Sequence, residues 1–237
     1  MKNITLIVGI LGALLAVSCT SDSPLPVPPG KGAFVPTLSA YRLGPRVGAS
    51  TTLRFTTTDI SEDEETTTIG SDYRFTVVDT AFRMPSGKVC YAVKRETITN
   101  GDVRLTDTTY HWVGERDLIT YERLTDTIGR RRLATPLLPG TRFILRDNLG
   151  DVESNTYVLR TLADTVRTPV TSFLNCAHVR MLSTTADNVS TTQFADEVWL
   201  APGFGIVRQV QTRIVTSKST GKASATILEF LLIARSS

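Results

Sequence analysis

The stretch that decides the fold reads TPVTSFLNCAHVRM at residues 168–181 and, after a polar gap, EVWLAPGFGIVR at residues 197–208. The Ala-Pro-Gly sequence at 201–203 ends a strand, because proline lacks a backbone donor and glycine tolerates positive φ. The whole stretch therefore predicts a strand, a loop, a second strand, a tight turn and a third strand.

Apolar residues in the first of these strands follow a period of two, as in a strand with one buried face. Phe173, Ala177 and Val179 share one face, whereas Cys176 and His178 share the other. This pattern indicates that the stretch serves to pack the sheet and does not form a catalytic site.

The rest of the chain repeats the strand pattern at short intervals. Threonine, which is β-branched and suits a pleated surface, makes up roughly one residue in seven. Segments bounded by turn residues read as further strands: 51–59, 72–83, 88–98, 102–113, 118–124, 155–166, 172–183, 194–201, 205–217 and 224–234. No window shows a convincing amphipathic helix. We expect an all-β, mainly antiparallel fold, a strongly curved meander sheet or half-barrel with little helix beyond the signal peptide.

Local signals place some of the turns. Asn100-Gly101 is the strongest hairpin signal in the chain. The acidic run SEDEETTT at 61–68 reads as a solvated loop, with a Ca²⁺ site as the weaker alternative because the spacing of a calcium loop is missing. Residues 129–146, which contain Arg130-Arg131-Arg132 and two prolines, read as a connection across the sheet or its edge. The three arginines read as part of a solvated loop, and contact with anionic lipid or an acidic partner is the alternative.

The N-terminus predicts export. Residues 1–18 combine Lys2, an apolar run and the small residues Ala16-Val17-Ser18, which is the pattern of a signal peptide. Cys19 follows directly, so the segment resembles a bacterial lipoprotein signal, which implies lipid attachment at Cys19. Ordinary secretory cleavage nearby is the alternative. Thr20 stands where that resemblance would require an acidic residue for inner-membrane retention, and the resemblance therefore implies the outer membrane.

Domain boundaries follow from composition. Residues 19–40 combine the attachment cysteine with a Pro-rich segment that reads as an extended tether. Residues 41–237 are long enough for one β domain with its own core. We therefore expect three parts: a signal peptide at 1–18, the tether at 19–40 and a single β domain at 41–237.

Two further cysteines lie in predicted strands. In an oxidising compartment Cys90 and Cys176 could form one disulfide, or they could be two separate thiols that act as small apolar side chains. The sequence leaves both readings open.

No catalytic or metal centre emerges. Cys176 and His178 lie on one strand face, and His111 is the other histidine, but a zinc site would need a further ligand and a reason for convergence. There is no GxSxG nucleophile motif. We expect no enzyme activity, no metal and no cofactor. The net charge of +3 is too small to indicate a nucleic-acid partner.

Aromatic residues of the predicted sheet offer a different site. Tyr91, Tyr110, Trp112, Tyr121 and Trp199 could line a concave apolar cavity, with ordinary core packing as the alternative.

The opening stretch also carries a family resemblance. The segment TPVTSFLNCAHV at 168–179 is followed by EVWLAPGFGIV at 197–207, and the Pro-rich segment 136–143 lies ahead of both. Together they resemble a pattern in uncharacterised bacterial lipoproteins. That resemblance implies a curved half-barrel similar to the LolA/LolB-type lipoprotein-localisation factors. The family has no established activity, so the resemblance bears on the fold. From Cys19, the tether and the curved sheet we expect a non-catalytic envelope lipoprotein that binds a lipid, an acyl chain or a protein partner. The alternative is a structural or assembly lipoprotein without a cavity.

Overall fold

The computed structural model describes residues 36–44, 46–145 and 156–236. These residues form an almost pure β structure with one 3₁₀ turn, η2 (Leu38–Tyr41). The strands are β1 (Ser50–Ile60), β2 (Glu65–Arg83), β3 (Val89–Thr99), β4 (Asp102–Val113), β5 (Asp117–Tyr121), β6 (Arg130–Ala134), β7 (Arg142–Ile144), β8 (Thr156–Arg167), β9 (Ser172–Ala186), β10 (Ser190–Ala201), β11 (Gly205–Ser217) and β12 (Ala223–Ser236). No helix within the described ranges has the length and apolar character needed to cross a bilayer.

All these strands belong to one antiparallel sheet with the order β6-β5-β4-β3-β2-β1-β12-β11-β10-β9-β8-β7. Every neighbour is also a neighbour in sequence except β1 and β12, which pair from Ser50↔Ser236 to Ile60↔Ala225. The sheet is therefore two meanders joined by the first and last strands. This confirms the all-β, antiparallel, strongly curved fold expected from the sequence.

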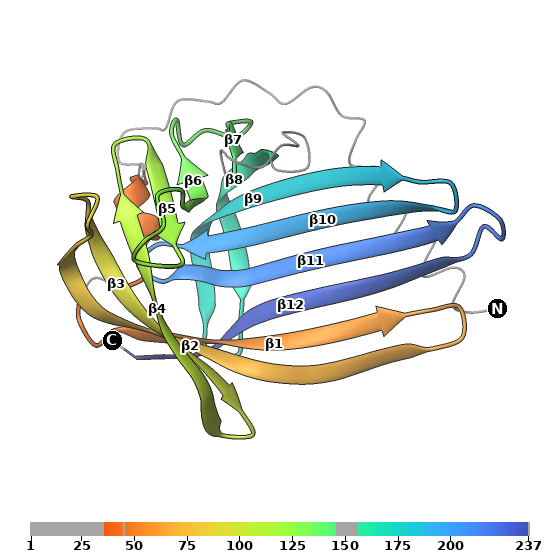
Figure 1. Cartoon of the computed structure of the whole chain (residues 1–237), viewed down its shortest axis with the longest axis horizontal. Helices are drawn as coiled ribbons and strands as arrows, with labels where there is room; N and C mark the ends of the chain where they lie inside the picture. Colours follow the sequence, from red (N-terminus) through yellow and green to blue (C-terminus); the bar gives the residue numbers. More distant parts are fainter. Residues whose placement is uncertain (1–35, 45, 146–155, 237) are drawn as a thin grey trace.

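The sheet curls until its two outer edges meet. The backbone N–H of Arg131 on β6 donates to the carbonyl oxygen of Leu145, just beyond β7, at 2.8 Å. The result is a nearly closed, barrel-like sheet rather than a half-barrel. In Figure 1, β1, β2 and β9 to β12 extend together beyond the shorter strands at one end. Curling covers the apolar face of a sheet that has no helices to pack against.

The hairpin of β8 and β9 bends sharply. Pairing between the two strands shifts register three times between Leu159 and Val166, and Asn175 adopts φ 56°. In Figure 1 this end of the hairpin runs steeply across the direction of β10 to β12. Val166 and Phe173 of the bent end pack in a buried cluster with Trp199 of β10. The alternation noted in the sequence is interrupted at Asn175 because the strand bulges there.

The turn at 201–205 holds the N-terminal segment in place. Gly203 donates from its backbone to the Ala40 carbonyl at 2.6 Å and accepts from the Gly44 N–H at 3.1 Å. Gly203 has φ 78°, a conformation for which glycine is suited. Leu38 and Tyr41 of η2 are buried in the main core beside β10. The turn thus connects two strands and docks the chain that precedes β1.

Turn predictions had mixed outcomes. The hairpin at Asn100-Gly101 is confirmed, with φ 53° and 86° joining β3 to β4. The predicted loop at 61–68 is too long, because β2 already begins at Glu65, opposite Ile60. The predicted connection at 129–146 contains β6 and β7, the two strands that close the sheet.

The proposed Cys90–Cys176 disulfide is wrong, because both thiols are free and buried. Cys90 on β3 packs with Met84 and Tyr121, whereas Cys176 on β9 packs with Phe173 and its neighbours. Five strands lie between β3 and β9 in the sheet order. Burial raises the pKa of both thiols, that of Cys176 to about 11. Both therefore act as small apolar side chains.

Candidate functional site

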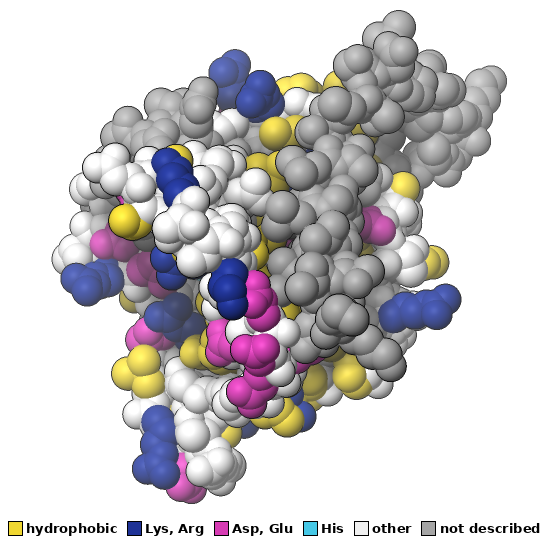
Figure 2. All heavy atoms as spheres, turned by 90° about the vertical axis from the view of Figure 1, so that its right-hand side faces the viewer, with side chains coloured by type: hydrophobic (Ala, Val, Ile, Leu, Met, Phe, Trp, Pro, Cys, Tyr) yellow, Lys and Arg dark blue, Asp and Glu magenta, His cyan; other side chains and the backbone are white. Residues whose placement is uncertain are grey.

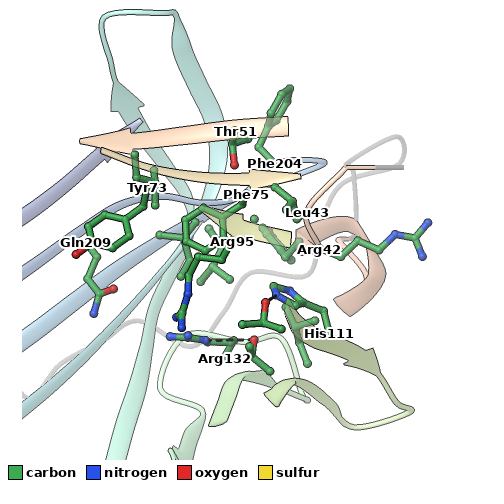
Figure 3. Close-up of a pocket in the computed structure, with 18 of the residues that line it drawn as sticks. Arg42, Leu43, Thr51, Tyr73, Phe75, Arg95, His111, Arg132, Phe204 and Gln209 are labelled. Atoms are coloured by element: carbon green, nitrogen blue, oxygen red, sulfur yellow. Dashed lines mark hydrogen bonds between the residues drawn. The ribbon is translucent and has the colours of Figure 1, made fainter. Parts of the chain in front are cut away.

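The inside of the barrel-like sheet holds a cavity of about 270 Å³ (Figure 3). Its wall comes from β1 to β6, from β10 to β12 and from the segment 41–43. Most of this wall is apolar, with Leu43, Leu53, Phe75, Leu200, Ile206 and Phe230 among the lining side chains.

Strand alternation decides which side chains reach the cavity. On β4 the lining residues are Thr109 and His111, and on β5 they are Leu118 and Thr120. Each pair is two residues apart, so both members point to the same face of the strand. The residues between and beside them point to the opposite face.

The same alternation turns two arginines of β6 inward. Arg130 and Arg132 line the cavity, whereas Arg131 binds Asp117 Oδ1 at 2.7 Å and the Ile144 carbonyl oxygen at 2.6 Å. The reading of Arg130-Arg131-Arg132 as a solvated loop is therefore wrong. A strand places every second arginine inside, and the sequence carried no alternation in residue type to reveal it.

A third arginine enters the cavity from β3. Arg95 donates from Nε to Asp107 Oδ1 at 2.9 Å and from Nη1 to Glu122 Oε2 at 3.2 Å. Figure 3 shows Arg95 and Arg132 both extending into the cavity, while Arg42 points away from it. Arg95 is thus a cavity cation with two carboxylate partners.

Arg130 and Arg132 are less well paired. The Nε of Arg130 is buried and has no hydrogen-bond partner. Arg132 donates from Nε to Thr120 Oγ1 over a long 3.4 Å. Burial, reinforced by the neighbouring charge of Arg130, lowers the pKa of Arg132 to about 10. Arg132 is half-buried and lines the cavity.

His111 also lines the cavity, within reach of the charge of Arg132. Burial first, and then the charge of Arg132, lowers the pKa of His111 to about 3, so its imidazole is neutral at pH 7. Its Nε2 lies 3.1 Å from Thr109 Oγ1. The ring therefore contributes a polar but uncharged part of the wall.

A buried polar network lies beside the cavity. Tyr157 donates from its hydroxyl to Asp196 Oδ2, and Gln209, which lines the cavity, donates from Nε2 to Asp196 Oδ1 at 2.9 Å. Burial and the Asp196 charge raise the pKa of Tyr157, so the hydroxyl remains protonated. Both oxygens of Asp196 are therefore occupied.

The five aromatic residues expected in the cavity do not line it. Tyr110 packs against Phe82 with the two rings tilted and their centroids 5.0 Å apart, on the face of β4 opposite to His111. Trp112 and Tyr121 lie 5.0 and 4.8 Å from the Lys88 ammonium group. These rings pack together in a separate buried cluster on the other face of β3 to β5, because they alternate with the lining residues.

The other two aromatic residues are also occupied elsewhere. Tyr91 lies under the Arg42 guanidinium, 4.4 Å from its ring centroid. Trp199 stacks on His178 at 4.3 Å and donates from Nε1 to Asp164 Oδ2 at 2.7 Å, on the face of β10 opposite to Leu200. The cavity prediction was therefore wrong in its residues, and core packing is the correct reading of these rings.

The histidines and cysteines do not converge. His111 faces the cavity, whereas His178 lies between Trp199 and the carboxylates of Asp164 and Glu197, each 3.6 Å from a ring nitrogen. Within the described ranges no cluster of three or more His, Cys, Asp or Glu residues could hold a metal ion.

The acidic run lies at the tip of the β1–β2 hairpin. Figure 2 faces the hairpin tips and shows acidic side chains gathered near the middle of this end. Glu62 pairs with Lys222 Nζ of the β11–β12 turn at 2.7 Å. The run therefore neighbours a lysine on the adjacent turn. Cys19, the expected site of lipid attachment, lies outside the described residues.

Comparison with known proteins identifies the fold. The chain matches no family model, and no curated protein matches it. A solved structure from Bacteroides fragilis NCTC 9343, described as a candidate exported protein with a YmcC-like fold, is 15% identical with a TM-score of 0.50, over 84% of this chain and 100% of that one. A candidate lipoprotein from Parabacteroides distasonis ATCC 8503 is 12% identical with a TM-score of 0.42, over 81% of this chain and 98% of that one. At such identity the likeness to the first structure is one of fold alone: the chain has a YmcC-like, barrel-like sheet.

Proposed function

We propose that this chain is a non-catalytic protein of the bacterial cell envelope that binds an apolar ligand, such as a lipid or an acyl chain, inside its curled sheet. The observation that carries this proposal is the cavity of about 270 Å³ with its largely apolar wall. Ligand pockets are typically about 300–1,000 Å³, predominantly apolar and supplied with a few polar groups. This cavity is close to the lower end of that range and suits a single small chain.

A carrier or binding role is supported over catalysis by the polar groups of the wall. His111 is neutral and its Nε2 is beside the Thr109 hydroxyl. The free thiols of Cys90 and Cys176 are buried in clusters away from the lining residues. Arginines hold charge but do not exchange protons at neutral pH. These groups are suited to recognition.

Export and anchoring complete the proposal. The signal-like segment 1–18, Cys19 and the Pro-rich residues after it support a lipid anchor, and Thr20 supports the outer membrane. The description of the similar Bacteroides fragilis structure as an exported protein supports export. The LolA/LolB-type carriers are the functional analogy. Metabolic labelling with an alkyne fatty acid tests the anchor, since Cys19→Ser should abolish the label.

A cavity-blocking variant tests ligand binding. Ile206 lines the cavity, whereas Leu182 on β9 is half exposed. Ile206→Trp should lower the affinity for the neutral apolar probe N-phenylnaphthylamine at least about tenfold, because an indole fills the space. Leu182→Trp adds the same indole outside and should leave the affinity unchanged. Extraction of the purified protein with organic solvent, followed by mass spectrometry, should identify a co-purified lipid.

Failure of both measurements would favour the alternative, an assembly protein that presents a sheet surface to an envelope complex. The exposed side chains of Val103 and Leu105 on β4 are the feature that favours this second role.

A further inference from the structure

The cavity has a cationic end that an apolar ligand alone does not explain. Four arginines line it, at 42, 95, 130 and 132, and Glu122 is the one carboxylate among the described lining residues. Arg42 stacks on Tyr91 and points away from the cavity. Three guanidinium groups therefore remain at the cavity.

The nearby carboxylates are already committed. Asp107 and Glu122 both accept from Arg95. Asp196 accepts from Tyr157 and Gln209. Arg132 interacts with Glu122 and Asp196 only at longer range, and a buried charge without a close partner is unfavourable.

The geometry of β6 brings the two remaining arginines to one place. Arg130 and Arg132 are two residues apart on one face, roughly 7 Å along the strand. Long arginine side chains from such positions can meet on a single carboxylate or phosphate, which they bind through paired N–H groups. The buried Nε of Arg130, which has no partner, is a donor prepared for such an acceptor.

Apolar side chains fill the wall next to this cationic end. Phe75, Leu118 and Ile206 line the same cavity as Arg130 and Arg132. We infer that the cavity takes an anionic amphiphile, whose carboxylate or phosphate headgroup binds Arg130 and Arg132 and whose short apolar tail lies against Phe75, Leu118 and Ile206. This inference rests on the proposed function and specifies its ligand class.

Three ligands with the same ten-carbon tail, together with inorganic phosphate, separate the possibilities in titration calorimetry with the delipidated full-length protein. Decanoate and decyl phosphate carry the two anionic heads, decanol carries a neutral head, and inorganic phosphate carries no tail. We expect at least one of the two anionic amphiphiles to bind about tenfold or more tightly than decanol, since hydrogen bonds to charged groups are stronger than neutral ones. Whichever of decanoate and decyl phosphate binds more tightly identifies the preferred headgroup, a carboxylate or a phosphate.

Variants assign the preference to residues. Arg130→Gln and Arg132→Gln should each reduce affinity for the preferred anion about tenfold and leave decanol binding unchanged. Glu122→Gln should raise the affinity for the preferred anion, because it removes a carboxylate that competes for the arginines. Arg104→Gln is the matched control, since Arg104 is exposed and pairs with Asp102 on the β3–β4 hairpin. Thermal melts of each variant without ligand check folding, and Arg132→Lys provides a variant that keeps the charge.

The outcomes are distinct. Equal affinity for decanol and both anions would overturn the headgroup inference and leave the proposed function intact. Binding of inorganic phosphate as tight as that of decyl phosphate would show that the tail contributes nothing and would also overturn it. Absence of binding by all three decyl ligands would overturn the proposed function itself. Loss of decanol binding together with anion binding in Arg130→Gln and Arg132→Gln would count against a headgroup role for these arginines.

Discussion

The backbone N–H of Arg131 donates to the carbonyl oxygen of Leu145 at 2.8 Å and joins the two edges of the sheet. The side chain of the same arginine binds Asp117 Oδ1 at 2.7 Å and the Ile144 carbonyl oxygen at 2.6 Å. One residue therefore links β5, β6 and the end of β7. The short strands β6 and β7 have few backbone bonds of their own, so this side chain is a substantial part of the closure.

Replacing Arg131 should weaken the closure. Arg131→Met removes charge-assisted bonds and leaves the half-buried Asp117 without this partner, so we expect the free energy of unfolding to fall by about 2 kcal/mol. Urea denaturation measures the change. Arg104→Met removes an ion pair that is more than half exposed and should change stability by less than about 0.5 kcal/mol. Equal effects of the two substitutions would contradict a special role for Arg131.

His111 should make the fold sensitive to mild acid. Its pKa is about 3 in the folded protein because of burial, against 6.5 in an unfolded chain. The unfolded state therefore takes up a proton first as the pH falls. The stability associated with neutral His111 is complete above pH 6.5 and is lost progressively toward pH 3. Between pH 7 and pH 5, protonation of His111 in the unfolded state lowers the free energy of unfolding by about 2 kcal/mol.

A His111→Gln variant isolates that contribution. Its stability should decline less than that of the wild type between pH 7 and pH 5, by about the same 2 kcal/mol. Denaturant unfolding at a series of pH values gives the two slopes. Parallel curves for both proteins would show that His111 does not titrate with a lowered pKa.

Adjacent residues on β10 should have separable effects. Trp199→Phe loses the hydrogen bond to Asp164 and should destabilise by about 1–2 kcal/mol, without any change in ligand affinity. Leu200→Ala truncates a buried cavity residue and should cost about 2–5 kcal/mol while it changes ligand affinity. Fluorescence titration with N-phenylnaphthylamine compares the two. A change in ligand affinity for Trp199→Phe would indicate that Trp199 contacts the ligand after all.

Both cysteines of the sheet should remain thiols. Without reducing agent, unfolded protein should react with maleimide at Cys90 and at Cys176, because these residues lie in separate clusters. Folded protein should react slowly at both, since burial raises the pKa of each thiol. Peptide mass spectrometry after labelling reads each site, and a peptide pair linked through Cys90 and Cys176 would contradict the expectation.

Period-two patterning and turn residues were sufficient to predict an antiparallel sheet. The hairpin at Asn100-Gly101 and the strand end at Ala201-Pro202-Gly203 follow from backbone preferences that act locally. The closing strands β6 and β7 were missed because they are short and because Arg130 to Arg132 lack alternation in residue type. Their strand conformation is imposed by the neighbours they pair with.

The residues of the candidate site were harder to predict from the sequence than the strands of the sheet. Alternation predicts which residues share a face but does not say which face becomes the inside. Tyr110 and His111 are adjacent in sequence, and only the direction of curling sends the histidine to the cavity and the tyrosine to the outside. The same choice turns Arg130 and Arg132 inward.

The sequence by itself thus determined the longer strands and their antiparallel order along each meander, because these depend on residues close together in the chain. Only the tertiary structure decided that β1 pairs with β12, that Arg131 meets Leu145 and that a cavity with a cationic end results. These features depend on contacts between residues far apart in sequence, which the curvature of the whole sheet brings together.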